Sequence, residues 1–107
     1  MDVKDFQENI VEFARRWDRV RNVTPSPAKT FRHLVEEVGE LARQYVNEDI
    51  RKEQYQEAEV KDAIGDATIQ LIKLAHLYGW NIMDVIGEIM EREETFLRDQ
   101  EQKLSKT

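Results

Sequence analysis

Two segments of the chain carry carboxylates at spacings that could hold a cation. Both place acids about one helical turn apart, as Glu36, Glu37 and Glu40 in the first segment and as Glu59, Asp62 and Asp66 in the second. If the two acidic faces met, like-charge repulsion would disfavour the cluster unless cations occupied it. Oxygen-only ligands suit Mg²⁺, or alternatively Mn²⁺, whereas zinc is disfavoured because the chain has no Cys.

Helical geometry decides which of these acids can share a face. With Glu37 as the origin and about 100° per residue, Glu40 lies near roughly −60° and Glu36 near roughly −100°. Glu37 and Glu40 can therefore converge, while Glu36 lies at the margin of their face. In the second segment all the acids fall within about 60° of one another. A cation bound between the two faces could clamp a polyphosphate and orient a water for attack on phosphorus.

The alternative interpretation is a solvated helix face, since an acidic stripe opposite an apolar one is typical of surface helices. Two observations count against it. Basic residues seldom alternate with these acids, because only His33 and Lys73 align with the stripes, and a solvated face usually mixes both signs. Gly39 and Gly65 also lie inside the two segments at a cost of about 1 kcal/mol each relative to Ala. Such glycines are explained if another backbone approaches closely there.

Composition limits the classes of protein that the chain can belong to. Its 107 residues suffice for one domain, and 40% hydrophobic residues with 4 Gly and 2 Pro favour helices over a turn-rich β fold. A net charge of −6 makes duplex nucleic acid a poor partner. The sequence contains no run long enough to span a membrane and no signal-peptide pattern at its start, so we expect a soluble, cytoplasmic protein without a membrane partner.

The first two helices have clear boundaries. Apolar residues at spacings of three and four predict a helix over residues 3–21, with Asp2 as its N-cap. Both prolines of the chain follow directly and end this helix. Ser26 and Pro27 are typical of an N-cap and a first helical position, and the second helix should run to about Asn47.

The third and fourth helices are separated by a strong turn signal. We expect the third helix to begin between residues 50 and 56 and to end at Tyr78, where Gly79 is placed for a C-terminal cap. Asn81, followed by Asp84 three residues later, is typical of the start of a fourth helix.

These elements predict an all-α fold, a bundle of about four helices that forms a single domain over residues 1–107. Residues 98–107 are polar, and we expect them to fray. Ile69 and Ile72 form a second apolar flank on the third helix, which a single chain would leave partly exposed. That flank favours assembly into a homo-oligomer.

The acidic motifs resemble those of a known family. The segment Glu36-Glu37-Val-Gly-Glu40-Leu resembles the EExxE motif of the all-α nucleoside triphosphate pyrophosphohydrolases, the MazG-like group. The segment that begins at Gly65-Asp66 resembles the helix opened by their ExxD motif, and the resemblance spans about residues 17–92. It implies Mg²⁺-dependent hydrolysis of a (d)NTP to the (d)NMP and pyrophosphate, by a homodimer or homotetramer.

The resemblance also implies roles for the acids. Its metal ligands would be Glu37, Glu40 and Asp66. The family's remaining Glu falls on Ala63, a departure from the pattern. We expect Asp62, one turn before Asp66, to replace it, with Glu59 in reserve because Glu59-Val-Lys-Asp62 also reads as ExxD. Glu36 or Glu59 would help to position the water, which makes Glu36, Glu37 and Glu40 the predicted catalytic group.

Substrate contacts have one candidate on each helix. The family uses basic or amide side chains of the last helix against phosphates, and Arg92 is the best placed here, followed by Lys73. Trp17 could stack on a base or belong to the core. His33 could contact a phosphate or be a plain surface residue. Arg92, likewise, could be a surface arginine rather than a phosphate ligand.

The leading hypothesis is therefore a nucleoside triphosphate pyrophosphohydrolase with a nucleotide substrate. The competing hypothesis is a non-catalytic helical module that acts by oligomerising or by binding a protein.

Overall fold

The computed structural model describes the backbone of residues 3–106 and the side chains of residues 5–106, so the cap predicted at Asp2 lies outside the described residues. The elements follow in the order α1 (Val3–Arg21), α2 (Pro27–Ile50), the short 3₁₀ helix η1 (Lys52–Gln54), α3 (Glu57–Leu77) and α4 (Ile82–Ser105). The described part of the chain contains no strand. The predicted all-α fold with four helices is confirmed.

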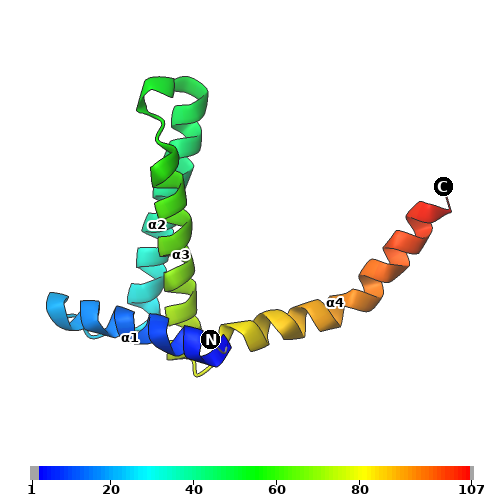
Figure 1. Ribbon diagram of the computed structural model, residues 1–107, viewed down its shortest axis with the longest axis horizontal. Coiled ribbons are helices and arrows are strands. Elements are labelled where there is room, and N and C mark those ends of the chain that lie inside the picture. Colours follow the sequence, from blue (N-terminus) through cyan, green and yellow to red (C-terminus); the bar gives the residue numbers. More distant parts are fainter. Residues whose placement is uncertain (1–2, 107) are drawn as a thin grey trace.

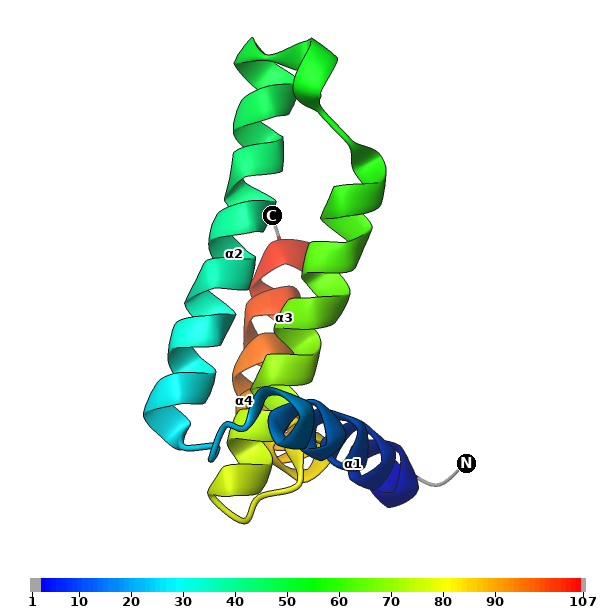
Figure 2. The same cartoon turned by 90° about the vertical axis from the view of Figure 1, so that its left-hand side faces the viewer.

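Three of the helices pack together and the fourth projects away (Figure 1). α2 and α3 form a long antiparallel hairpin, and α1 crosses its lower end, as the turned view also shows (Figure 2). α4 leaves from the same end and points outward, which gives the chain extents of 58 × 42 × 28 Å. The predicted bundle is therefore not closed within one chain, because α4 meets the other helices only near its own first turn, at the end of α3 and at Gln7 of α1.

The local boundary signals at α2 act as predicted, except at its end. Ser26 Oγ accepts a hydrogen bond from the backbone N–H of Lys29 at 3.2 Å, and Pro27 occupies the first turn. The helix then continues three residues beyond Asn47, to Ile50. Asn47 is buried inside it, with its Nδ2 3.4 Å from the carbonyl oxygen of Gln54. Asn47, near which the helix was expected to end, instead lies within α2 and links it to η1 through its side chain.

The turn between α3 and α4 has the predicted caps. Gly79 adopts φ 80°, which favours glycine, and its N–H donates to the His76 carbonyl at 2.8 Å. Asn81 Oδ1 accepts from the N–H groups of Met83 and Asp84 at 3.1 and 3.2 Å.

The predicted fraying after residue 98 is wrong up to Ser105, where α4 ends. Two ion pairs at i,i+4 spacing support this last part of the helix, Glu94 with Arg98 at 2.8 Å and Asp99 with Lys103 at 3.4 Å.

The core is small and lies where α1 crosses the hairpin. Its buried apolar residues are Val11, Ala14, Ala63, Ile72 and Ala75. The expectation of a partly exposed flank is wrong for Ile72, which is 5% exposed, whereas Ile69 is half-buried and so remains partly exposed. The close approach expected at Gly39 and Gly65 is also absent among the described residues, since a Cβ at either position would meet no atom within 4 Å.

Two polar contacts fix α1 across the hairpin. The buried Gln7 donates from Nε2 to the carbonyl oxygen of Trp80 at 3.0 Å and accepts at Oε1 from the N–H of Ile82 at 2.8 Å. Lys73 Nζ lies 2.9 Å from an Asp18 carboxylate oxygen, and both side chains are 13% exposed. α1 is thus joined to α3 at one end and to the start of α4 at the other.

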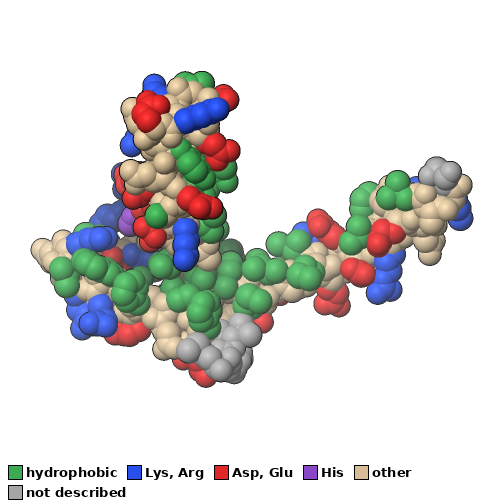
Figure 3. All heavy atoms as spheres, turned by 45° about the horizontal axis from the view of Figure 1, so that its top comes forward, with side chains coloured by type: hydrophobic (Ala, Val, Ile, Leu, Met, Phe, Trp, Pro, Cys, Tyr) green, Lys and Arg blue, Asp and Glu red, His purple; other side chains and the backbone are tan. Residues whose placement is uncertain are grey.

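α4 keeps a stripe of large apolar side chains in contact with solvent. The exposed members include Ile86, Ile89, Met90, Phe96 and Leu97. In Figure 3 the hydrophobic side chains form a continuous surface from α1, across the base of the hairpin, onto α4. A search for membrane spans over the described residues finds no helix with the length and apolarity that crossing a bilayer requires.

Candidate functional site

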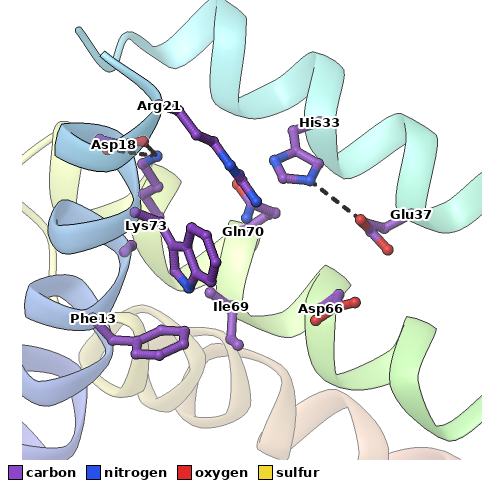
Figure 4. Close-up of a pocket in the computed structure, with 11 residues that line it drawn as sticks. Phe13, Asp18, Arg21, His33, Glu37, Asp66, Ile69, Gln70 and Lys73 are labelled. Carbon is purple, nitrogen blue, oxygen red and sulfur yellow. Dashed lines mark hydrogen bonds and ion pairs between the residues drawn. The ribbon is translucent and has the colours of Figure 1, made fainter. Parts of the chain in front are cut away.

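A pocket of about 180 Å³ lies between α1, α2 and α3. Its wall combines aromatic, charged and amide side chains from all three helices. The residues that line it are Phe13, Ala14, Trp17, Asp18, Arg21, His33, Glu37, Asp66, Ile69, Gln70 and Lys73. The hairpin supplies Glu37 and Asp66, whereas α1 supplies Asp18 and the aromatic rings, so the pocket exists only because α1 crosses the hairpin (Figure 4).

Glu37 is the acid most enclosed by this pocket. Its side chain is 13% exposed, and its Oε1 lies 3.2 Å from Nε2 of His33 one turn earlier. Its other oxygen, Oε2, is buried without a hydrogen-bond partner among the described residues. A buried carboxylate oxygen without a donor is unstable by itself and is a suitable ligand for a cation.

The charges around Glu37 also favour a bound cation. Burial raises the pKa of its carboxyl above the ordinary value of 4.5, and the nearby carboxylates of Asp66 and Glu40 raise it further. The interaction with His33 opposes them. Asp66 and Glu40 therefore both lie close enough to Glu37 to repel its charge. Glu40, however, is exposed and does not line the pocket.

The other predicted acids lie farther out. Glu36, Glu59 and Asp62 are exposed and do not line the pocket, so the structure does not bring them to Glu37. Among the described side chains, no group of three or more acids and histidines stands close enough to hold a metal ion alone. Mg²⁺ seldom needs such a cage, since it is usually bound by one or two carboxylates together with waters and substrate phosphates. The donor set at Glu37 fits that open kind of site.

Three of the four predicted substrate-binding residues line the pocket. Trp17 is 45% exposed, so the core interpretation is wrong for the single chain. His33 lines the pocket and contacts Glu37, although its side chain is 38% exposed. Its contact with a phosphate stays a prediction. Lys73 also faces the pocket, but its ammonium group is paired with Asp18. Arg92 is exposed on the projecting α4 and is not part of the pocket.

Sequence reasoning missed three polar residues of this pocket, Asp18, Arg21 and Gln70. Arg21, the last residue of α1, places its guanidinium carbon 4.8 Å from the centre of the Trp17 ring. Gln70 is 9% exposed and follows Asp66 by one turn on the same face of α3. The same angular count that grouped the acids places Gln70 within about 40° of Asp66, so periodicity could have found it. Arg21 had no such signal, because its position depends on how α1 crosses the hairpin.

Comparison with known proteins agrees with this geometry. The family model described as the MazG nucleotide pyrophosphohydrolase domain matches residues 25–95, which include α2, α3 and the first half of α4. Neither the curated proteins nor the solved structures that were searched contain a match to the chain.

Proposed function

Since the chain belongs to the MazG nucleotide pyrophosphohydrolase domain family, we propose that it hydrolyses a nucleoside triphosphate to the monophosphate and pyrophosphate. The attack would fall on the α-phosphorus, where water adds and pyrophosphate leaves. Either ribose or deoxyribose would fit this description of the substrate.

The observation that carries the proposal is the enclosed Glu37 beside Asp66 and Glu40. A structural acid would be paired with a base on both oxygens or exposed to water, and Glu37 Oε2 is neither. Burial, and after it repulsion from Asp66 and Glu40, raises its pKa, and a bound cation would offset this cost of holding the charge.

The residues that would hold Mg²⁺ are Glu37, Glu40 and Asp66, with Asp62 or Glu59 replacing the family Glu at Ala63. Bound there, Mg²⁺ would neutralise phosphate charge and lower the pKa of a water. His33 holds Glu37 in place through the 3.2 Å contact to Oε1, which leaves Oε2 directed away from the imidazole. Glu36 or Glu59 would help to position the attacking water.

The other pocket residues would bind the nucleotide. Trp17 offers an aromatic face, and Arg21 brings a guanidinium that makes no ion pair among the described residues. Because Lys73 is paired with Asp18, it supplies positive potential near the pocket rather than a free donor.

The active protein would contain at least two copies of the chain. A compact monomer of 12.7 kDa exposes about 6,200 Å², whereas this chain exposes 8650 Å². Its radius of gyration is 18.2 Å, against about 13 Å for a compact chain of this length. The excess area of about 2,400 Å² is of the size that obligate interfaces bury. These values support a homodimer, or a homotetramer built from dimers, that covers the apolar face of α4.

Such an assembly would also give Arg92 a role. Arg92 lies on α4 about 60° from Ile89, at the edge of the apolar stripe. If α4 of one copy lay on the hairpin of the other, Arg92 would approach phosphates bound near the acids of that copy.

The test is a panel of ribo- and deoxyribonucleoside triphosphates incubated with Mg²⁺ and assayed for pyrophosphate. Release from at least one nucleotide, abolished by EDTA, is the expected result. No release across the panel from folded protein would leave the non-catalytic module as the better description.

A further inference from the structure

The pocket is too small for a whole nucleotide, and its charges indicate which part it receives. Pockets that enclose a drug-sized ligand measure about 300 Å³ or more, whereas this one measures about 180 Å³. More than half of the residues that line it can carry a charge, namely Asp18, Arg21, His33, Glu37, Asp66 and Lys73. A wall of this kind suits a charged group better than a flat base, so the phosphate chain is the part that fits.

Two of these charges, one of each sign, have no ion pair among the described residues. They belong to Arg21, at the end of α1, and to Asp66, on α3. The other four form two pairs, Lys73 with Asp18 at 2.9 Å and His33 with Glu37 at 3.2 Å. A phosphate bound to a cation matches the two unpaired charges, because the cation needs an acid and the remaining phosphate oxygens need a base.

The C-terminal cap of α1 fixes the position of Arg21. Asn22 adopts φ 56°, and its N–H donates to the carbonyl oxygen of Arg19 at 3.1 Å. The N–H of Val23 donates to the carbonyl oxygen of Asp18 at 2.8 Å. These two bonds end the helix directly after Arg21, so the backbone that carries the guanidinium is held at the edge of the pocket.

The contact of Arg21 with Trp17 leaves hydrogen-bond donors available. The guanidinium carbon lies 4.8 Å from the centre of the indole ring. A cation–π contact is an attraction to the charge, and it leaves most of the five N–H donors of a guanidinium free. In Figure 4 the Arg21 side chain extends from α1 into the space between His33 and Gln70. All its polar hydrogens are donors, so it can bind an anion there whichever edge it presents.

The surroundings of Arg21 are the basic part of an acidic chain. Residues 15–33 contain six Lys and Arg and a single acid, Asp18, which is paired with Lys73. The rest of the chain contains ten Lys and Arg against 21 acids. In Figure 3 Lys and Arg side chains gather at the left, around the end of α1. A phosphate chain that approaches from this end therefore meets an attractive potential.

Resting on the proposed function, we propose that Arg21 is a phosphate ligand of the nucleotide. Its guanidinium binds non-bridging oxygens of the phosphate chain from the α1 side of the pocket. Glu37 and Asp66 face the same chain from the hairpin, where they would hold its cation. This contact comes from the first helix and needs no second copy of the chain. Because the base takes no part in it, Arg21 contributes equally to the binding of a nucleotide and of inorganic tripolyphosphate.

The experiment measures binding rather than turnover. The non-hydrolysable α,β-imido analogue of ATP and inorganic tripolyphosphate are each titrated into the full chain with Mg²⁺ by calorimetry. Arg21→Gln should weaken both ligands by the same factor, about tenfold to a hundredfold, as expected for a lost charge-assisted hydrogen bond. Arg21→Lys keeps the charge without the planar fork, so it should recover part of the loss for both ligands.

Arg19→Gln is the matched control. It removes the same charge from the same helix, at an exposed residue that lies 3.5 Å from Glu12 and does not line the pocket. At physiological salt an exposed charge outside the pocket is screened, so both affinities should change by about twofold or less.

Three results overturn the inference: no binding of tripolyphosphate to the wild type, equal affinities in the wild type and Arg21→Gln, or an equal loss in Arg19→Gln. A loss confined to the nucleotide also overturns it, because Arg21 would then contact the base. Failure of the proposed function looks different, since tripolyphosphate binding would still depend on Arg21 while no nucleotide releases pyrophosphate. Pyrophosphate release with an unchanged kcat/KM in Arg21→Gln would overturn the inference and leave the function in place.

Discussion

The hairpin with α1 and the arm formed by α4 use apolar residues in opposite ways. α1, α2 and α3 meet around a small core and enclose the acidic pocket between them. α4 is as long as α2, yet none of its residues is buried. The two regions therefore differ in role. The hairpin with α1 can position the pocket residues within one chain, whereas α4 is stabilised only when a second molecule covers its apolar stripe. The predictions below test that separation, from the largest expected effect to the smallest.

Removing a predicted metal ligand should abolish turnover without changing assembly. Asp66→Ala and Glu40→Ala each should lower pyrophosphate release by about a thousandfold or more, because several kcal/mol of charge stabilisation is lost. The molar mass from light scattering should stay that of the wild type. Glu101→Ala, an acid of α4, serves as the matched control and should remain active. Full activity of Asp62→Ala would show that Asp62 does not replace the family Glu and would transfer that role to Glu59.

Placing a charge on the apolar stripe of α4 should weaken assembly instead. Phe96→Asp should raise the dissociation constant of the oligomer by about a hundredfold, the effect of losing a central interface residue. Thr95→Asp adds the same charge on the opposite side of the helix, where it should leave the molar mass unchanged. Light scattering over a dilution series measures both. A Phe96→Asp protein with the wild-type mass at every dilution would show that α4 is not the contact surface.

Breaking the contact between α1 and α3 should destabilise the first region. Asp18→Asn leaves the largely covered Lys73 ammonium unpaired and should lower the free energy of unfolding by about 2 kcal/mol, less than for a completely buried pair. Replacing both groups, as in Asp18→Asn with Lys73→Met, should recover most of that loss. Urea denaturation monitored by circular dichroism measures the differences. Equal losses in the single and double variants would mean that the ion pair does not hold α1.

Neutralising Glu37 should stabilise the metal-free protein. Its folded-state pKa lies above the ordinary 4.5, so the folded state binds the proton more tightly than the unfolded state. The contribution of Glu37 to the stability of the wild type therefore rises as pH falls from neutrality toward 4.5. Glu37→Gln should melt a few degrees higher than the wild type at pH 7 in EDTA, and the gap should close in acid. A gap that persists at pH 4 would indicate a cause other than charge.

Glycine replacement gives the smallest effect. No atom lies within 4 Å of a Cβ built at Gly65 or Gly87, and Ala should stabilise each helix by about 1 kcal/mol. Thermal unfolding of Gly65→Ala and Gly87→Ala compares the hairpin with the arm. Destabilisation at Gly65 alone would reveal that a helix of a second copy approaches the hairpin there.

Local features were predictable from the sequence because their causes are local. Ser26, Gly79 and Asn81 mark helix ends through their own backbone and side-chain geometry, and the periodicity of α3 grouped Asp66 with the other acids. The fold class and the acidic pair Glu37 and Asp66 follow from such signals.

The shape of the site was not predictable in this way. It depends on contacts between distant positions, such as Asp18 with Lys73, 55 residues apart, and Gln7 with Trp80, 73 residues apart. Without the crossing of α1 that these contacts fix, Trp17 could not be told from a core residue and Arg21 gave no signal. The projection of α4 is likewise a property of the whole chain, because its apolar stripe would look the same on a helix packed inside a bundle.

The side-chain amide of Gln7 sets the direction in which α4 points. By holding the carbonyl of Trp80 and the N–H of Ile82 together, it fixes the angle at which α4 leaves the hairpin. α4 has 24 residues and is about 36 Å long, so a rotation of about 5° at its first turn moves its last turn by about 3 Å. The register of any helix that packs along α4 is therefore set, at its far end, by the geometry of one buried side chain near the beginning of the chain.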